Sequence, residues 1–121
     1  MKLYNTLTRK TETLVGNDDQ IKMYVCGITP YAPSHLGHAM CAVVFDVLRR
    51  YLEYKGFEVI HIQNFTDVDD KMIDAAIETG VDLEELAESN IDEYLTQLKQ
   101  LNILPAFLYP RATHEIPKII E

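Results

Sequence analysis

The sequence predicts an α/β fold, the amino-terminal half of a doubly wound parallel sheet. The apolar segment 21–26 is typical of a strand that is covered on both faces. Residues 35–55 place apolar side chains at three- and four-residue spacing, as one face of a helix does. Residues 57–63 form a second strand, so 21–63 make one strand-helix-strand unit with a right-handed crossover.

The elements before and within this unit follow from local composition. Residues 1–20 begin with a polar segment and contain the turn-prone sequence 16–19. They are expected to form an edge hairpin or arm. Residues 27–34 contain Pro30 and Pro33 and must be a loop. Gly56 should end the helix. The helix face expected to be buried consists of Leu36, Met40, Val43, Val44, Val47, Leu48, Tyr51 and Leu52.

The second half of the chain predicts helices and no third strand. Thr66 with Asp69 three residues later resembles a capping pair, and the helix that follows ends at Gly80. Residues 82–100 predict another helix, whose buried stripe is Leu83, Leu86, Ala87, Ile91, Leu95, Leu98 and Leu101. A loop spans 105–110, and Thr113 is expected to cap a last helix at 116–121. So short a helix has little stability of its own, so we expect the natural sequence to continue.

Composition fits one ordinary globular domain over residues 1–121, 47% of them hydrophobic. No run of about 18 apolar residues could span a membrane, and no signal peptide is present, so a cytoplasmic protein without a membrane partner is expected. The net charge of −8 argues against a protein that binds nucleic acid over its general surface. The basic residues Arg49, Arg50 and Lys55 are expected on a solvated helix face. Two cysteines provide no disulfide framework.

The sharpest pattern is the tetrad His35-Leu36-Gly37-His38, nine residues after the first strand and at the start of the long helix. A helix N-terminus beside the carboxyl end of a parallel strand binds phosphates through its unpaired N–H groups and dipole. Gly37 would let a ligand approach the backbone, and the two imidazoles would donate to phosphate oxygens during nucleotidyl transfer. The pattern predicts an ATP site. The alternative is a capped helix start with two surface histidines.

The cysteines and remaining histidines give weaker patterns. Cys26 ends the first strand and is either a small buried residue or a thiolate metal ligand. A zinc site needs three more ligands, and the sequence contains no C-x-x-C or H-x-x-x-H cluster to supply them. Cys41 is expected in the core. His61 and His114 are expected to be structural or surface-facing.

The polar segment 64–71 is a second candidate site. Its carboxylates could simply complement a first helical turn. It also follows the second strand at the same sheet edge as the tetrad, where the hydroxyl of Thr66 or a carboxylate could hold an amino group.

Taken together, these motifs resemble the cysteinyl-tRNA synthetases, class I aminoacyl-tRNA synthetases, in the same order over nearly the whole chain. The segments that carry the resemblance are 4–8, 25–31, 35–39, 45–46, 64–71 and 110–114. The resemblance implies the N-terminal portion of a Rossmann-like (HUP-type) catalytic domain. It also implies that cysteine is activated with ATP to cysteinyl-adenylate and then transferred to the 3′ end of the cysteine tRNA.

The resemblance also implies roles for single residues. The catalytic histidines His35 and His38 would bind the ATP phosphates, with Gly37 against the nucleotide and with Gly27 and Thr29 in the adjoining loop. Cys26 would be a ligand of a zinc that selects the substrate thiol, with Gly27 beside the substrate. Because zinc binds a thiolate far better than a hydroxyl, such a site separates cysteine from serine. Thr66 would lie near the amino group of the amino acid.

Two features leave alternatives open. The K-M-S-K-S loop of class I synthetases and any anticodon-binding helices are absent from these residues, so this portion is not expected to turn over alone. The tetrad and residues 29–31 equally resemble the cysteine ligase of mycothiol biosynthesis, whereas Lys71 after Asp69 and Asp70 favours the synthetase. An H-x-G-H cytidylyltransferase would bind CTP without using Cys26, and a regulatory module would bind ATP without forming an adenylate.

Overall fold

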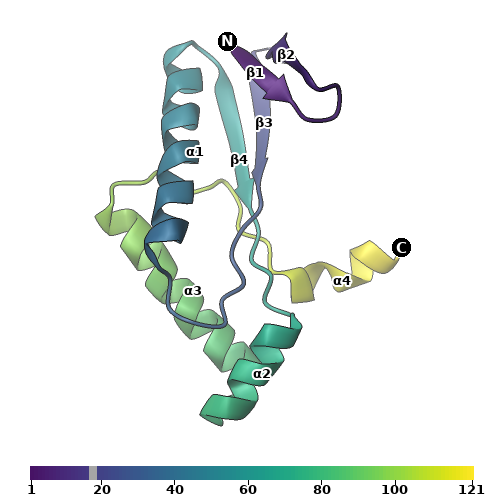
Figure 1. Cartoon of the computed structure of the whole chain (residues 1–121), viewed down its shortest axis with the longest axis vertical. Helices are drawn as coiled ribbons and strands as arrows, with labels where there is room; N and C mark the ends of the chain where they lie inside the picture. The colour runs from purple at the N-terminus through teal and green to yellow at the C-terminus, as the bar shows by residue number, and fades with distance from the viewer. Residues whose placement is uncertain (17–18) are drawn as a thin grey trace.

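The computed structural model describes residues 1–16 and 19–121. The predicted turn at 16–19 falls partly on Asn17 and Asp18, which lie outside the described residues. Along the chain the elements are β1 (Lys2–Asn5), β2 (Lys10–Thr13), β3 (Gln20–Val25), α1 (Leu36–Tyr54), β4 (Glu58–Gln63), α2 (Asp70–Thr79), α3 (Leu83–Gln100) and α4 (Ala112–Ile120) (Figure 1). β1 and β2 pair antiparallel, which confirms the expected hairpin.

The central unit is β3, α1 and β4, as the sequence predicts. β3 and β4 pair parallel, in a register that sets Ile21 beside Val59 and Val25 beside Gln63. α1 connects the two strands and packs along β4 (Figure 1). Gly56 follows the end of α1 with a φ of 92°, the left-handed conformation that glycine adopts without strain. The carboxyl ends of both strands therefore lie at one edge of the sheet.

A third segment runs parallel to β4 in the region predicted to be a loop. Phe107 N–H donates to the carbonyl of His61, and Gln63 N–H donates to the carbonyl of Leu108. Further along, Phe65 N–H donates to the carbonyl of Pro110, so the proline supplies an acceptor where it has no donor. The predicted loop at 105–110 forms no regular strand, but isolated parallel bridges join Leu108 to Ile62 and Arg111 to Phe65. The local pattern of Pro105 and Pro110 did not indicate this pairing, because the partner lies about 45 residues earlier in the chain.

Among the described residues, most of the buried apolar side chains form two clusters. Around the carboxyl end of β4 are Ile28, Ala42, Phe65, Ile91, Tyr94 and Leu98. At the other end are Ile21, Leu52 and Val59. The first cluster joins the loop after β3, the helix α1, the loop after β4 and α3, so it fixes the relative positions of the segments that carry the candidate site.

The apolar stripe predicted for α1 is mostly exposed. Leu36 is 84% exposed, Met40 67% and Val47 60%, and only Ala42 and Leu52 of this helix are buried. Cys41 is exposed as well, so its expected place in the core was wrong. The physical reason is that α1 packs on a sheet with only two regular strands among the described residues, which covers a narrow part of its surface.

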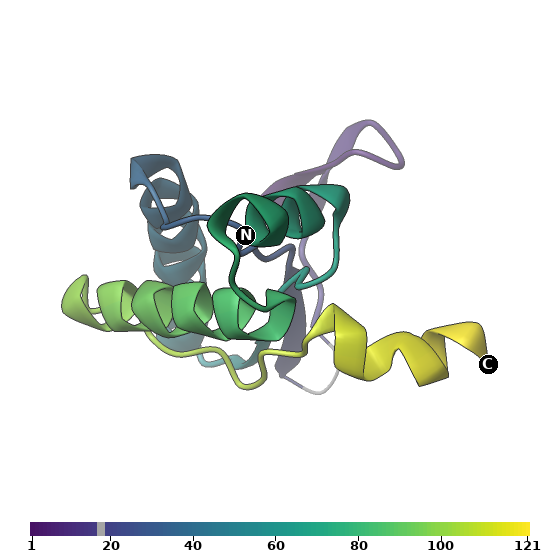
Figure 2. The same ribbon diagram turned by 90° about the horizontal axis from the view of Figure 1, so that it is seen from below.

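Two predicted caps differ from the structure. Asp69, not Thr66, caps α2, because its side chain accepts from Lys71 N–H at 2.9 Å. α4 begins at Ala112, four residues earlier than predicted, so Thr113 lies inside its first turn. Figure 2 shows α4 extending away from the other helices. The sequence contained several residues able to cap each helix, and tertiary contacts selected among them.

The basic residues of α1 have structural partners. Arg49 donates to the carbonyl of Pro105 at 2.7 Å, and Arg50 donates to the carbonyl of Asn102 at 2.7 Å. Asp46 accepts from Leu104 N–H at 2.9 Å. These contacts hold the segment after α3 against α1. None of the helices among the described residues is long and apolar enough to cross a membrane.

Candidate functional site

The site lies where the loops that follow β3 and β4 meet. Gly27 N–H donates to Asn64 Oδ1 at 2.8 Å, and Thr66 N–H donates to the carbonyl of Ile28 at 3.0 Å. These two hydrogen bonds join segments almost 40 residues apart in the chain. The two candidate regions of the sequence, the approach to the tetrad and segment 64–71, therefore belong to one edge of the sheet.

Gly27 allows this contact. A Cβ at this position would lie 1.3 Å from the backbone oxygen of Asn64, a distance that no side chain can accommodate. The resemblance implies a ligand-binding role for Gly27, and the structure adds that its missing side chain is needed for the two loops to pack. This second role could not be read from the sequence, because the neighbouring residue comes from another strand.

Helix α3 anchors the loop that approaches the tetrad. Asn90 donates to the carbonyl of the buried Pro30 at 2.9 Å, and Ser34 donates to Gln97 Oε1. Asn90 is itself buried beside Ile91, within the apolar stripe of α3. The sequence reasoning missed these anchors. A polar residue inside a predicted apolar stripe was the available indication, because a buried amide requires hydrogen-bond partners.

The tetrad forms the amino terminus of α1, as predicted. His35 is the N-cap, and its Nδ1 accepts from Gly37 N–H at 3.1 Å. In return, His38 Nδ1 accepts from His35 N–H at 3.2 Å. The first turn of α1 contains no acidic residue, so no side-chain carboxylate neutralises the positive end of its dipole. This arrangement favours an anion at the helix terminus.

The two imidazoles of the tetrad are stacked, with ring centroids 3.9 Å apart and an angle of 15° between the rings. Gly37 makes room for them, because a Cβ there would lie 2.9 Å from Cε1 of His35. Since Nδ1 of each ring accepts a hydrogen bond, the neutral form of each carries its proton on Nε2, where it can be donated to a ligand.

The two histidines differ in exposure, His35 being exposed and His38 half-buried. Desolvation by burial, and then the nearby His35, lowers the pKa of His38 below its usual value. This shift favours the neutral form of His38. A bound phosphate would raise this pKa again and strengthen its hydrogen bond to the ring.

Cys26 is the first residue after β3, and its thiol is exposed and unbonded to other cysteines. An exposed thiol at a strand end is accessible to a metal or substrate. Within residues 1–16 and 19–121, however, no group of three or more His, Cys, Asp or Glu side chains could hold a metal ion. The described residues therefore do not make a zinc site by themselves.

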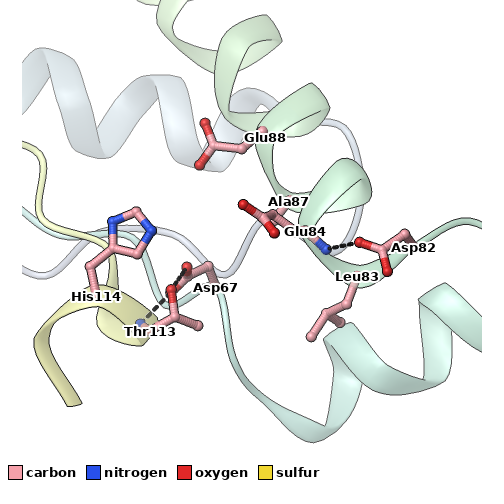
Figure 3. Close-up of a pocket in the computed structure, with 8 residues that line it drawn as sticks. All are labelled: Asp67, Asp82, Leu83, Glu84, Ala87, Glu88, Thr113 and His114. Carbon is pink, nitrogen blue, oxygen red and sulfur yellow. Dashed lines mark hydrogen bonds between the residues drawn. The ribbon is translucent and has the colours of Figure 1, made fainter. Parts of the chain in front are cut away.

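The segment that contains Thr66 is also fixed on its other side. Ala112 N–H donates to the carbonyl of Phe65 at 3.0 Å, and Thr113 N–H donates to Asp67 at 3.0 Å. Figure 3 shows Asp67 and Thr113 side by side at the wall of a cavity of about 400 Å³. Thr29 and Thr66 are half-buried in the two loops that meet at this edge.

The cavity is bordered by the first turns of α3 and α4. Its lining residues are Asp67, Asp82, Leu83, Glu84, Ala87, Glu88, Thr113 and His114 (Figure 3). The guanidinium of Arg111 donates two hydrogen bonds of 2.9 Å to the carboxylate of Glu88. This hydrogen bonding lowers the pKa of Glu88. The guanidinium also lies 5.1 Å from the ring centre of Phe65, so Arg111 connects α3 to the loop after β4.

The other two histidines lie where a structural or surface role is expected. His61 is 7% exposed in β4, and its Nε2 has no hydrogen-bond partner among the described residues. Burial and then the charge of Arg49 lower its pKa. His114 is an exposed residue at the cavity wall.

Comparison with known proteins gives a consistent result. A family model described as "tRNA synthetases class I (C) catalytic domain" matches residues 12–121. The chain is 57% identical to a cysteine–tRNA ligase from Dehalococcoides mccartyi over its whole length, which is 27% of that protein. It is 53% identical to a cysteine–tRNA ligase from Archaeoglobus fulgidus, again over its whole length and 26% of that protein. The chain thus spans about a quarter of the length of these relatives.

Solved structures with the same fold include Mycobacterium tuberculosis methionyl-tRNA synthetase in complex with methionyl-adenylate. That structure superimposes with a TM-score of 0.69 at 26% identity, covering 76% of this chain and 18% of the synthetase. A second structure of the same enzyme, bound by methionyl-adenylate, matches at a TM-score of 0.69 and covers 77% of this chain and 19% of the synthetase. The predicted α/β class, a partial Rossmann-like fold with a parallel sheet, is confirmed.

Proposed function

Because the chain belongs to the family of class I tRNA synthetase (C) catalytic domains, we propose that it is the N-terminal portion of the catalytic domain of a cysteine–tRNA ligase. The observation that carries this proposal is 57% identity to such a ligase over every residue of the chain, with the His-Leu-Gly-His tetrad at the N-terminus of α1. In the proposed reaction the carboxylate of cysteine attacks the α-phosphorus of ATP and pyrophosphate leaves. The terminal ribose of the tRNA then attacks the carbonyl, and AMP leaves.

We assign ATP binding to the tetrad. The reciprocal caps hold both rings with Nδ1 turned to the backbone, so the Nε2–H groups of His35 and His38 are the donors for phosphate oxygens. The unneutralised helix dipole adds to this attraction. Charge on these oxygens grows as the bond to pyrophosphate breaks, so preorganised donors lower the barrier more than they tighten ground-state binding. Gly27, Thr29 and Gly37 belong to the same nucleotide-binding edge.

We assign the amino-acid side of the site to Cys26, Gly27 and Thr66. Thr66 Oγ1 accepts a hydrogen bond of 3.4 Å from Nδ2 of Asn64, the residue whose Oδ1 accepts from Gly27 N–H. This hydroxyl would accept from the ammonium group of cysteine. Cys26 would be one ligand of a zinc whose other ligands lie outside these residues, and that zinc would select a thiol over a hydroxyl.

The tRNA is the remaining partner. With a formal net charge of −8, this portion offers little general affinity for a polyanion, so most tRNA contacts are assigned to other parts of the enzyme. We place the enzyme in the cytoplasm, where the cysteine thiols stay reduced.

The test is cysteine-dependent ATP–pyrophosphate exchange by the full-length natural polypeptide that carries these residues. Exchange with cysteine and ATP, followed by acylation of the cysteine tRNA, supports the proposal. Exchange without tRNA acylation, but with transfer of cysteine to an amino sugar, would instead favour the mycothiol-type ligase. Use of CTP with an alcohol acceptor would favour a cytidylyltransferase, and ATP binding without exchange a regulatory module.

A further inference from the structure

The segment 64–67 lies between the loop that follows β3 and the start of α4. Thr66 contacts the first of these and Asp67 contacts the second. On the β3 side, Thr66 N–H donates to the carbonyl of Ile28. On the opposite side, Asp67 receives both the backbone N–H and the hydroxyl of Thr113, with the N–H at 3.0 Å. Thr66 is therefore fixed by its own backbone on one side and by its neighbour's side chain on the other.

Asp67 makes this contact from an almost fully buried position. It is 7% exposed, and each of its two carboxylate oxygens accepts one hydrogen bond from Thr113. The contact lies at the first turn of α4, where the partial positive charge of the helix terminus stabilises a carboxylate. Breaking one of these hydrogen bonds would leave a buried charge incompletely satisfied, so the pair strongly favours one geometry.

The contact is more than a helix cap. The N-cap of α4 is Arg111, whose guanidinium is bonded to Glu88, and Asp67 reaches the helix from a different loop, 46 residues earlier. A cap is normally supplied by the residue next to the helix. Here the carboxylate of Asp67 ties the start of α4 to the loop that follows β4. Asp67 is the neighbour of Thr66, the residue assigned to binding the amino acid.

We propose that Asp67 is a positioning residue for the amino acid, and that it acts through its contact with Thr113 by fixing the hydroxyl of Thr66. This inference rests on the proposed function. Asp67 does not touch substrate. Its effect is to hold Thr66 where the ammonium group of cysteine binds, whereas Asn90 and Gln97 of α3 hold the loop that leads to the tetrad through Pro30 and Ser34.

Because the tetrad does not contact Asp67 or Thr113 directly, the proposal gives a specific expectation. Loosening the contact between Asp67 and Thr113 should weaken the use of cysteine and leave the use of ATP nearly unchanged. A merely structural role would instead change both substrates together, or lower the amount of folded enzyme without changing either KM. The KM values for cysteine and ATP therefore distinguish the two explanations.

The experiment measures ATP–pyrophosphate exchange by the full-length enzyme with Thr113→Val, Thr113→Ser and Asp67→Asn. Thr113→Val keeps the backbone donor and the shape but removes the hydroxyl, and we expect KM for cysteine to rise about tenfold, as for one lost charge-assisted hydrogen bond. Thr113→Ser should restore KM to within about twofold. Asp67→Asn removes the charge and should raise KM for cysteine at least as much. In all three, KM for ATP should stay within about twofold.

The matched controls are Asp74→Asn on the exposed face of α2 and Thr96→Val on the exposed face of α3, both expected to behave as wild type. Circular dichroism and the thermal midpoint check that each variant is folded. Three results would overturn the positioning role: equal changes in the KM values for cysteine and ATP, unchanged KM values in Thr113→Val and Asp67→Asn, or failure of Thr113→Ser to restore KM for cysteine. Cysteine-dependent exchange by the wild type would still uphold the proposed function in each of these cases. Absence of cysteine-dependent exchange in the wild type would overturn both.

Discussion

The imidazole of His35 lies on the imidazole of His38, with 3.9 Å between the ring centroids. Each ring also accepts a hydrogen bond from the backbone at the start of α1, so each is held by the helix terminus that it caps. Because both Nδ1 atoms are used in this way, both Nε2 atoms remain for a ligand. The capping interaction and the proposed phosphate site are thus made by opposite nitrogens of the same two rings.

The first prediction concerns Gly37. In Gly37→Ala the new methyl group would lie within 3 Å of the His35 ring and would push it off the cap. We expect loss of about 1 kcal/mol of stability, as for a removed N-cap, and a fall in adenylation rate of about tenfold or more. Urea denaturation and pyrophosphate exchange measure the two effects. Leu36→Ala, at a residue 84% exposed in the same turn, is the control.

The second prediction concerns the role of the half-buried imidazole. His38→Ala in the full-length enzyme should lower the rate of adenylate formation by about a hundredfold, because it removes a donor to developing charge. It should change cysteine binding far less. Single-turnover adenylation and equilibrium binding of cysteine measure the two. Equal losses in both would mean that the ring supports folding or ground-state binding instead.

The third prediction compares two glycines. Gly27→Ala should cost about 3 kcal/mol or more, because its methyl group would overlap the backbone of Asn64, 1.3 Å away. Gly56→Ala meets no atom within 4 Å but requires an alanine at φ 92°. It should cost only about 1–2 kcal/mol. Thermal and urea unfolding of both variants test the difference. A cost for Gly27→Ala no greater than for Gly56→Ala would show that the two loops can separate freely.

The fourth prediction concerns acid stability. Burial lowers the pKa of His61, so the unfolded chain binds a proton more readily than the folded one does. The contribution of neutral His61 to the free energy of unfolding is therefore complete above the unfolded pKa of about 6.5. It is lost as the pH falls from there through the lower pKa of the folded state. His61→Leu should therefore flatten the dependence of unfolding free energy on pH between about pH 7 and 5.

The fifth prediction concerns zinc. Calorimetric titration of residues 1–121 with zinc should give no tight stoichiometric site in the monomer, because the described residues group no three metal ligands. The same titration of the full-length enzyme should give one site, which Cys26→Ser weakens. A nanomolar site in the monomeric portion would contradict the assignment of Cys26 as a lone ligand here.

The candidate site was predictable to the extent that its parts are contiguous. The tetrad could be placed at a helix N-terminus because the strand, the prolines and the helical spacing are all local in sequence. The resemblance then supplied roles for Cys26 and Thr66, which stay proposals. The anchors Asn90 and Arg111 and the contact between Asp67 and Thr113 were missed, since each joins residues from different elements.

By itself the sequence determined the order and type of the main elements, because helix periodicity and the turn preferences of glycine and proline act between near neighbours. Tertiary structure alone decided that Asp69 rather than Thr66 caps α2, that residues 107–112 run beside β4, and that the apolar stripe of α1 is largely exposed. It also gave Gly27 its second role against Asn64. Such outcomes depend on which distant segment lies alongside, and local preferences are too weak to select that partner.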